Sequence, residues 1–363
     1  MSKNVIIGQS GGPTAVINSS LAGVYKAACS LGADKVYGMK YGIEGLLKEE
    51  MLELNVLLDD RMSIELLKRT PSSYLGSCRF KLPDPDTDAT PFVKLFTLFD
   101  KYDICAVFYI GGNDSMDTIA KLSRYGQQVG SSVRFIGVPK TIDNDIYGTD
   151  VTFGFHTAVD IATDVIDRIH TTAGSHSRVM CIEIMGNKAG WLTLYSGIAG
   201  GADIILLPEQ PYDIDRVCEA VERRAKRGSN FSIIAVAEGA MNVDEAKLKR
   251  KEWAAKRAEA GYTTATNRIA QAVQKKTGME TRVCIPGHMQ RGGSPSAYDR
   301  VLATQFGSYA AKLVEIEQYG VTVALVNNHV ISNRLEDIAG KTRNIPEGCE
   351  LLTVAKRMGI SLG

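Results

Sequence analysis

Three polar turns in this chain combine residue types that can bind or transfer a phosphate. The first contains Gly11 and Gly12 in Q-S-G-G-P, the second reads G-G-N-D-S from Gly111 to Ser115, and the third reads P-K-T-I-D-N-D from Pro139. Adjacent glycines let backbone N–H groups approach an anion closely. Lysine supplies a cation, and carboxylates can hold a metal ion or take a proton from an attacking hydroxyl. Together the turns hold the components that phosphoryl transfer requires.

The third turn carries the densest set of reactive groups. Lys140, Thr141, Asp143, Asn144 and Asp145 bring an amine, a hydroxyl, an amide and two carboxylates into six residues. Phosphoryl transfer uses a cation for the phosphates, an acidic group for Mg²⁺ and a carboxylate as general base. The alternative is a solvated turn, since Asp and Asn are common turn residues. We favour the chemical interpretation because this mixture of groups is unusual in a turn that binds nothing.

The first two turns also have structural interpretations. A glycine turn can simply reverse the chain, and the first turn matches neither the Walker pattern G-x-x-x-x-G-K-[ST] nor the dinucleotide pattern G-x-G-x-x-G. In the second turn, Asp114 can bind a metal ion or orient a lysine, but Asp114 and Ser115 are also good helix N-caps. Each turn alone therefore leaves both interpretations open.

A fourth group of polar residues lies at or next to the ends of apolar runs. It supplies arginines for a phosphate, a carboxylate for sugar hydroxyls and a histidine. Its members are Arg178, Met185, Gly186, Asn187, Glu238, Arg282, His288 and Arg291. The group predicts a binding site for a phosphorylated, hydroxyl-rich molecule.

Short apolar runs, each followed by a polar turn and a segment with helical spacing, must position these residues. The runs expected to be strands are residues 5–8, 106–110, 135–138, 179–184, 204–207, 232–237 and 321–325. Helical patterns follow at 14–21 and 116–124. This alternation predicts an α/β protein with mainly parallel sheets. Open α/β sheets bind ligands at the carboxyl ends of their strands, where the three turns lie. The charged stretch 244–276 is expected to form a solvated surface helix.

Length and composition limit the classes of function. With 363 residues, the chain should form two domains in one compact subunit. Lys and Arg total 42 against 41 for Asp and Glu, which does not favour binding to nucleic acid or to a membrane. The 7 cysteines have no metal-ligand spacing, and no apolar run resembles a signal peptide or a membrane span. We expect a cytoplasmic protein with free thiols.

Taken in order, these motifs resemble the phosphofructokinase family over essentially the whole chain. The family's T-I-D-N-D is present from Thr141 to Asp145, and its G-H-x-Q-R-G-G-S-P is complete from Gly287 to Pro295. The resemblance implies Mg²⁺-dependent phosphorylation of fructose 6-phosphate at its 1-hydroxyl. It also implies two doubly wound, Rossmann-like lobes with the active site between them. The larger lobe would be 1–154 plus 290–340 and carry donor and catalytic motifs, and the smaller lobe would be 155–289 plus 341–363 and bind the sugar phosphate.

The resemblance also implies roles for individual residues. Asp143 matches the general base, with Thr141, Asp145 and Lys140 as its catalytic neighbours. The donor-binding positions are Gly11, Gly12, Arg79, Gly112, Asn113, Asp114 and Ser115. The sugar-phosphate positions are Thr141, Asp143, Arg178, Met185, Gly186, Asn187, Glu238, Arg282, His288 and Arg291. Arg178 and Arg282 match arginines that reach the site from a neighbouring subunit, so a homodimer or homotetramer is implied.

The residues at two positions distinguish between ATP and pyrophosphate as the phosphoryl donor. ATP-using members of the family usually have glycine where this chain has Asp114 and Lys140, and pyrophosphate-using members resemble this chain. A carboxylate at Asp114 would occupy the space beyond the β-phosphate of ATP and repel its charge, whereas Lys140 offers a cation to the smaller anion. We therefore expect pyrophosphate as the donor and a readily reversible reaction.

The chain also departs from the family at two positions. Asn113 stands where Asp is common, which leaves Asp114 as the expected Mg²⁺ ligand, with Asn113 and Asp143 as weaker candidates. Asn187 stands where Arg is common, so Lys140 or Lys188 would supply that cation. The alternatives are an ATP-dependent phosphofructokinase, a non-catalytic sugar-phosphate-binding subunit, and an enzyme that also accepts sedoheptulose 7-phosphate.

Overall fold

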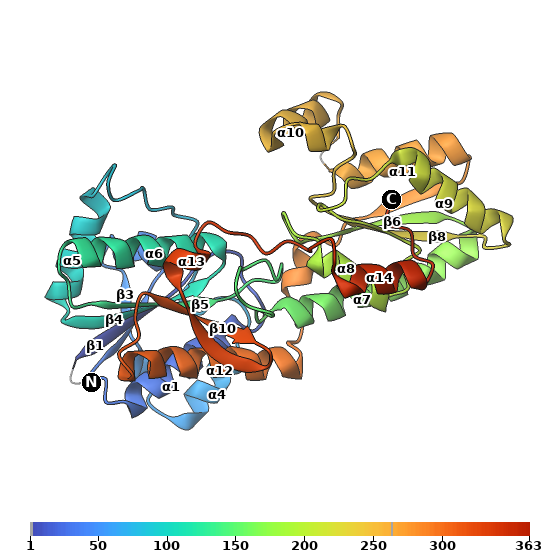
Figure 1. Ribbon diagram of the computed structural model, residues 1–363. Coiled ribbons are helices and arrows are strands. Elements are labelled where there is room, and N and C mark those ends of the chain that lie inside the picture. Colours follow the sequence, from blue (N-terminus) through green and yellow to red (C-terminus); the bar gives the residue numbers. More distant parts are fainter. Residues whose placement is uncertain (1–2, 263) are drawn as a thin grey trace. The chain divides into compact units, whose positions relative to one another are not determined.

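The computed structural model describes residues 3–262 and 264–363, which form two compact units. Unit 1 contains the described chain up to Ile142 together with Ile146–Thr157 and Arg291–Thr342. Unit 2 contains Asp143–Asp145, Ala158–Gln290 and Arg343–Gly363. Each unit has its own sheet covered by helices, so the predicted α/β class with two mainly parallel sheets is confirmed (Figure 1). The donor and sugar roles of the two lobes stay predictions.

The described residues of unit 1 form a sheet of seven strands. Its spatial order is β11-β10-β5-β4-β1-β2-β3. The bounds are β1 (Asn4–Gln9), β2 (Val36–Met39), β3 (Met51–Glu53), β4 (Ile104–Gly111), β5 (Arg134–Pro139), β10 (Val321–Val326) and β11 (His329–Arg334). The five central strands are parallel, and β3 and β11 pair antiparallel at the two edges.

Helices cover both faces of this sheet (Figure 1). One face carries α1 (Ile17–Ser30), α4 (Arg61–Arg69) and α12 (Ala297–Glu315), and the other carries α5 (Thr90–Lys101) and α6 (Asn113–Gln128). Three short helices complete the unit: α2 (Gly42–Leu46), α3 (Leu54–Leu57) and α13 (Leu335–Ile338).

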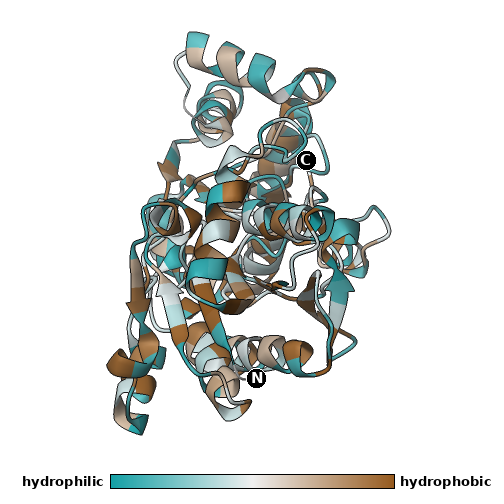
Figure 2. Ribbon diagram, turned by 90° about the vertical axis from the view of Figure 1, so that its left-hand side faces the viewer, coloured by the Kyte–Doolittle hydropathy of each residue, from teal (hydrophilic) through white to brown (hydrophobic). Residues whose placement is uncertain are grey.

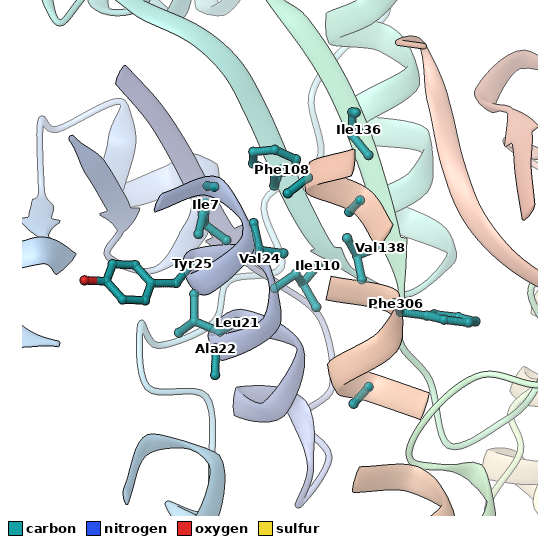
Figure 3. Packing of buried hydrophobic residues seen from close by; sticks show 14 of the residues in the cluster. Ile7, Leu21, Ala22, Val24, Tyr25, Phe108, Ile110, Ile136, Val138 and Phe306 are labelled. Atoms are coloured by element: carbon teal, nitrogen blue, oxygen red, sulfur yellow. The ribbon is translucent and has the colours of Figure 1, made fainter. Parts of the chain in front are cut away.

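The central strands are apolar without alternation because both of their faces are buried. Phe108 and Ile110 of β4 pack with Leu21 and Val24 of α1 and with Phe306 of α12 (Figure 3). On the opposite face, residues of β1, β4 and β5 pack against α5 and α6. Brown, hydrophobic segments accordingly run through the strands in Figure 2, while many helices carry both colours. This packing fixes the strand ends from which the polar turns emerge.

Unit 2 has, within its described residues, a four-stranded parallel sheet in the order β7-β8-β6-β9. The strands are β6 (Val179–Ile184), β7 (Ile204–Leu206), β8 (Ser232–Ala237) and β9 (Thr281–Cys284). The helices are α7 (Phe155–His176), α8 (Trp191–Ala199), α9 (Ile214–Lys226), α10 (Arg250–Glu259), α11 (Ala265–Thr277) and α14 (Glu350–Arg357). Two 3₁₀ turns span Glu245–Lys247 and Gly287–Arg291.

All seven predicted apolar runs lie at strands, but four strands escaped prediction. The unpredicted strands are β2, β3, β9 and β11. β3 has only three residues, and β11 is an edge strand with only two apolar residues, Val330 and Ile331. β9 contains Arg282 and has one buried residue, Thr281. These strands have too little apolar sequence to stand out.

The charged stretch 244–276 differs from the predicted solvated surface helix. It forms a 3₁₀ turn followed by α10 and α11, and α11 buries Ile269 and Val273 against the sheet. Arg257 and Glu245 are also buried and form an ion pair with an Nε to Oε1 distance of 2.7 Å. Arg268 pairs with the same carboxylate at 2.7 Å. Most of the described charged side chains in this stretch are nevertheless exposed, as predicted, and the buried exceptions are Glu245 and Arg257, which are paired with each other.

Two further observations concern the whole described chain. Every helix in residues 3–262 and 264–363 is too short or too polar to cross a lipid bilayer. Within the same residues, the cysteines are free thiols.

Candidate active site

The three predicted turns begin at the carboxyl ends of three adjacent parallel strands in unit 1. The first follows β1, the second follows β4 and the third follows β5, and these strands are neighbours in the order β5-β4-β1. Parallel strands place their carboxyl ends at one edge of the sheet, which is the usual ligand-binding edge of an open α/β sheet. The fold therefore brings together turns that lie more than twenty residues apart in sequence.

Backbone hydrogen bonds tie the first glycine turn to its neighbours. Ser10 N donates to the Ile110 carbonyl at 2.9 Å, and Gly11 N donates to the Cys78 carbonyl at 3.2 Å. The Ser77 hydroxyl donates to the Gly11 carbonyl at 2.6 Å. Gly11 has φ 78°, a left-handed conformation that favours glycine. These bonds hold the turn in a fixed shape, as a preorganised anion site requires.

Lys140 connects the third turn to the first. Its side chain is 1% exposed, and its ammonium group donates to the Gly12 carbonyl. A Cβ added to Gly11 would lie 3.5 Å from the Lys140 Nζ. The Lys140 N–H donates to the Gly111 carbonyl at 2.9 Å, which joins the second and third turns. A buried positive charge thus lies beside the glycine turn.

The second turn opens α6 without a side-chain cap. Gly112 is the N-cap residue, and no side chain accepts a hydrogen bond there. The structure therefore contradicts the alternative in which Asp114 and Ser115 serve as caps. The Ser115 hydroxyl is buried, and no described protein atom forms a hydrogen bond with it. It lies 3.9 Å from the position of a Cβ on Gly11. A buried polar atom without a protein partner is typical of a position that contacts a ligand or water.

Asp114 points to solvent rather than into a buried pocket. Its side chain is 74% exposed and forms an ion pair with Lys81, with an Oδ1 to Nζ distance of 2.9 Å. The hydrogen bond that Lys81 donates to Asp114 raises the pKa of Lys81. The sequence had led us to expect that the carboxylate of Asp114 repels the charge of ATP. The structure corrects this point, because Lys81 balances much of the charge of Asp114.

Arg291 and Arg79 complete the donor side. A Cβ added to Gly12 would lie 2.9 Å from the Arg291 guanidinium carbon, so only glycine allows this approach. The resemblance had assigned Arg291 to the sugar phosphate, and unit 1 places it beside the donor turn. Arg79 is exposed in the loop whose Cys78 carbonyl binds Gly11. We call Gly11, Gly12, Gly112, Ser115, Lys140 and Arg291 the donor-side cluster.

The end of the third turn belongs to unit 2. Asp143 is half-buried, whereas Asn144 and Asp145 are 3% and 4% exposed. Asn144 has φ 54°, a conformation that costs free energy for residues other than glycine. The preceding Thr141, in unit 1, accepts a hydrogen bond from the Thr152 hydroxyl at its carbonyl, at 2.9 Å. A strained residue therefore adjoins the proposed general base.

Several predicted sugar-phosphate residues gather in unit 2 at the carboxyl ends of β6 and β8. Asn187 N donates to Glu238 Oε1 at 2.6 Å, and Met185 N donates to Gln290 Oε1 at 3.1 Å. Gly186 has φ 148°. We call Met185, Gly186, Asn187, Glu238 and Gln290 the sugar-side cluster. His288 lies two residues before Gln290 in the same 3₁₀ turn.

Arg178 and Arg282 do not join this cluster. Arg178 immediately precedes the first residue of β6, whereas Met185 follows its last. Arg282 lies in the neighbouring strand β9, where it pairs with Met180 of β6. Both arginines form ion pairs with Glu280, Arg178 with an Nε to Oε2 distance of 3.0 Å. The hydrogen bond from Arg178 lowers the pKa of Glu280. Within unit 2 these arginines therefore lie apart from the other residues that were predicted to bind the sugar phosphate.

Sequence reasoning missed three residues that contact the candidate site. Gln290 lies inside the recognised G-H-M-Q-R-G-G segment, so that motif could have pointed to it. Lys81 and Arg343 had no such signal. Each contacts a site residue distant in sequence, Lys81 pairing with Asp114 and Arg343 binding the carbonyls of Asn144 and Asp145.

The donor set suits a magnesium ion that arrives with phosphates. The described residues contain no group of three or more His, Cys, Asp or Glu side chains placed to hold a metal. Mg²⁺ in phosphoryl-transfer sites commonly uses only one or two carboxylates, with waters and substrate phosphates as its other ligands. Asp114 is exposed in the first turn of α6, beside Asn113 and near the Ser115 hydroxyl that has no protein partner. These residues fit such a partial coordination set.

Comparison with known proteins decides the family. The family model described as "Phosphofructokinase" matches residues 4–314. The chain belongs to the phosphofructokinase family. Among curated phosphofructokinases, it is 42% identical over 361 residues to the ATP-dependent 6-phosphofructokinase of Spirochaeta thermophila, covering 98% of this chain and 96% of the relative. It is 39% identical to ATP-dependent 6-phosphofructokinase 3 of Bacteroides thetaiotaomicron, covering 98% of each chain.

Solved phosphofructokinase structures share the fold. The pyrophosphate-dependent phosphofructokinase of Nitrosospira multiformis matches with a TM-score of 0.84 and 27% identity, covering 100% of this chain and 89% of that one. The pyrophosphate-dependent enzyme of Marinobacter aquaeolei matches with a TM-score of 0.81 and 28% identity, covering 99% and 88%. The phosphofructokinases similar to this chain thus include proteins named for each donor.

Proposed function

We propose that this phosphofructokinase transfers a phosphoryl group from pyrophosphate to the 1-hydroxyl of fructose 6-phosphate. The products are fructose 1,6-bisphosphate and phosphate. Family membership supports the sugar and the reaction class. The choice of pyrophosphate rests on Lys140 and Asp114.

The observation that carries the donor proposal is the burial of Lys140 against the glycine turn. Its ammonium group carries three N–H donors and lies beside Gly11 and Gly12. Pyrophosphate concentrates its negative charge in a small volume, so a fixed cation at this point favours it strongly. Arg291, on the other side of Gly12, adds a second cation. A glycine at position 140, as in ATP-using members of the family, would remove the cation that Lys140 provides.

Asp114 also favours pyrophosphate over ATP, mainly because its side chain occupies space. Its carboxylate lies at the second position of α6, next to the donor-side cluster. ATP continues past its β-phosphate to an α-phosphate and adenosine, whereas pyrophosphate ends there. The ion pair with Lys81 reduces the charge repulsion that Asp114 exerts. The remaining obstacle for ATP is steric, because the pair of side chains fills space that a glycine would leave open.

In the proposed mechanism, Asp143 accepts the proton of the sugar's 1-hydroxyl as the oxygen attacks phosphorus. Asp114, with Asn113 and Asp143 as further candidates, would hold Mg²⁺, which would neutralise charge on the phosphate oxygens. Lys140 and the backbone of the Gly11–Gly12 turn stabilise the charge that develops on the transferred group. The sugar-side cluster binds and orients fructose 6-phosphate. Because phosphate leaves and a phosphate ester forms, the reaction is expected to run in both directions.

ATP is the second candidate donor, and a specific observation favours it. The curated relatives with 38% to 42% identity are named ATP-dependent, whereas the matching structures named for pyrophosphate are 27% to 28% identical. Overall similarity therefore favours ATP, while the side chains at positions 114 and 140 favour pyrophosphate. A direct comparison of donors separates the two.

The test measures the initial rate of fructose 1,6-bisphosphate formation with Mg²⁺, using pyrophosphate or ATP at equal concentrations. The proposal expects a preference for pyrophosphate of a hundredfold or more, about 3 kcal/mol. The matched variant is Asp114→Gly/Lys140→Gly, which restores both glycines and should shift the preference toward ATP. A wild-type rate with ATP alone would refute the donor proposal, and no rate with either donor would refute the reaction.

A further inference from the structure

The strained turn that carries Asp143 is held by a residue from the far end of the chain. Arg343 Nη1 donates to the Asn144 carbonyl at 3.1 Å, and Arg343 N donates to the Asp145 carbonyl at 2.8 Å. All these residues belong to unit 2. Asn144 lies between Asp143 and Asp145 and has the left-handed φ of 54°. A conformation of this kind persists only where surrounding contacts enforce it.

Arg343 is itself held in place by contacts with the aromatic ring of Trp191. Its guanidinium carbon lies 4.1 Å from the centre of the Trp191 ring, within cation–π distance. The Trp191 indole N–H donates to the Arg343 carbonyl at 2.9 Å. Trp191 is 6% exposed at the start of α8, so it offers a rigid surface for the guanidinium. One residue thus holds both the side chain and the backbone of Arg343.

A half-buried carboxylate contacts the same two segments. Glu209 Oε1 accepts hydrogen bonds from Gly190 N and Ile345 N, each at 3.0 Å. Gly190 precedes Trp191, and Ile345 follows Arg343 by two residues. Burial raises the pKa of Glu209, and the two backbone hydrogen bonds oppose this rise. Glu209 therefore fastens the chain on both sides of the Trp191–Arg343 contact.

We propose that Arg343 is a positioning residue that holds the turn from Asp143 to Asp145 in its catalytic conformation. This inference rests on the proposed function, since it assigns Arg343 to the reaction in which Asp143 is the base. Arg343 acts through the carbonyls of Asn144 and Asp145. A guanidinium can bind a carbonyl with one N–H while its flat face stacks on an indole, and a lysine cannot do both with the same geometry.

The first experiment compares Arg343→Ala and Arg343→Lys with wild type. A displacement of the base by about an ångström can lower the rate on the order of a hundredfold. We therefore expect kcat to fall roughly ten- to a hundredfold, while the dissociation constant of fructose 6-phosphate, measured by calorimetry, stays within about twofold. Guanidinium at millimolar concentration should restore part of the kcat of Arg343→Ala, and it should not rescue Asp143→Ser.

Arg134→Ala is the matched control. Arg134 likewise donates to a backbone carbonyl, that of Val314 at 3.0 Å, and lies over an aromatic ring, Tyr319 at 5.7 Å. It begins β5 at the opposite end from Lys140. Loss of Arg134 should leave kcat unchanged. If Arg343→Ala does not fold, Trp191→Phe, which removes the indole N–H, replaces it and should lower kcat in the same sense.

Amide hydrogen exchange of a peptide covering residues 141–147 gives a readout that does not depend on turnover. Exchange should accelerate in Arg343→Ala and not in Arg134→Ala. An active wild type with equal kcat and equal exchange in Arg343→Ala would overturn this inference alone. A wild type inactive with both pyrophosphate and ATP would overturn the proposed function, and the exchange result would then decide whether Arg343 orders the turn.

Discussion

Asp143 and Lys140 lie three positions apart in one turn, yet their surroundings suit them to different tasks. Asp143 is half-buried, as a base that must meet a substrate hydroxyl should be. Lys140 is almost fully buried and held by the backbone of the glycine turn. In the proposed mechanism, Asp143 exchanges a proton and Lys140 provides a fixed charge. The two therefore call for separate tests.

Asp143→Ser should lower kcat by a factor on the order of a thousand, because a general base contributes roughly 10² to 10⁴ to the rate. The dissociation constant of fructose 6-phosphate should change little. Steady-state rates and calorimetry measure the two quantities. Equal losses of binding and of turnover would argue against the assignment of Asp143 as the base.

Lys140→Met keeps most of the side-chain volume and removes the charge. We expect kcat/KM for pyrophosphate to fall ten- to a hundredfold, about 1.4 to 2.8 kcal/mol, with fructose 6-phosphate binding retained. Lys188→Met is the control, since Lys188 is exposed in unit 2 and was the other predicted donor cation. A larger effect at Lys188 than at Lys140 would reverse the two roles.

Sequence motifs pointed to candidate site residues but not to the partners of those residues. The glycines, Lys140 and Asp143 stand in short patterns whose spacing shows their chemistry. Nothing in the sequence links Asp114 to Lys81 or Asn144 to Arg343, because these pairs form only when distant segments meet.

At the scale of elements, the three polar turns lie at strand ends as expected, and the charged segment before α11 is mostly exposed as expected but also contains a buried ion-pair cluster. Apolar runs buried on both faces identify central strands reliably. A run of charges identifies a solvated helix only when the charges lack partners. Glu245 accepts hydrogen bonds from both Arg257 and Arg268, and the Arg257 guanidinium lies 4.1 Å from the centre of the Trp253 ring. This cluster anchors α10 to unit 2.

The Glu245 cluster should make the stability of unit 2 depend on pH. Burial by itself would raise the pKa of Glu245, but the hydrogen bonds from Arg257 and Arg268 outweigh it and lower the pKa to about 2. Because the folded-state pKa is lower than the unfolded value, this stability is present above the ordinary glutamate range. It is lost as pH falls from there to about 2. The shift corresponds to about 3 kcal/mol.

Thermal unfolding at pH 6 and pH 3 tests this dependence. Glu245→Gln should be less stable than wild type at pH 6 and should lose less stability between the two values. Glu259→Gln, at an exposed position at the end of α10, should behave as wild type. The same pH dependence in Glu245→Gln and wild type would exclude this carboxylate as its source.

At the scale of the whole molecule, Arg178 and Arg282 suggest a shared site. Both pair with Glu280 and lie apart from the sugar-side cluster of their own chain. Their placement is consistent with a role in a neighbouring subunit, as the family resemblance implies. An oligomer of identical chains would give each site residues from two copies. Light scattering should find a dimer or a tetramer.

Mixing two inactive variants tests the sharing directly. Arg282→Ala and Asp143→Ser should each be nearly inactive, and co-expression should restore about a quarter of wild-type activity if dimers form at random and sites are shared. This fraction follows because half of the dimers are hybrids with one intact site of two. Activity no higher than that of the single variants would show that each chain builds its own site.

Segments of the two units alternate along the chain, so unit 1 cannot be completed until most of unit 2 has been synthesised. β5 lies between β4 and β10 in the finished sheet, and β10 is made only after most of unit 2 has left the ribosome. Until then β5 is an exposed, apolar edge beside the nascent donor turn, and such edges favour aggregation. A ribosome stalled before residue 321 should therefore carry a chain that recruits chaperones. One stalled after α14 should not.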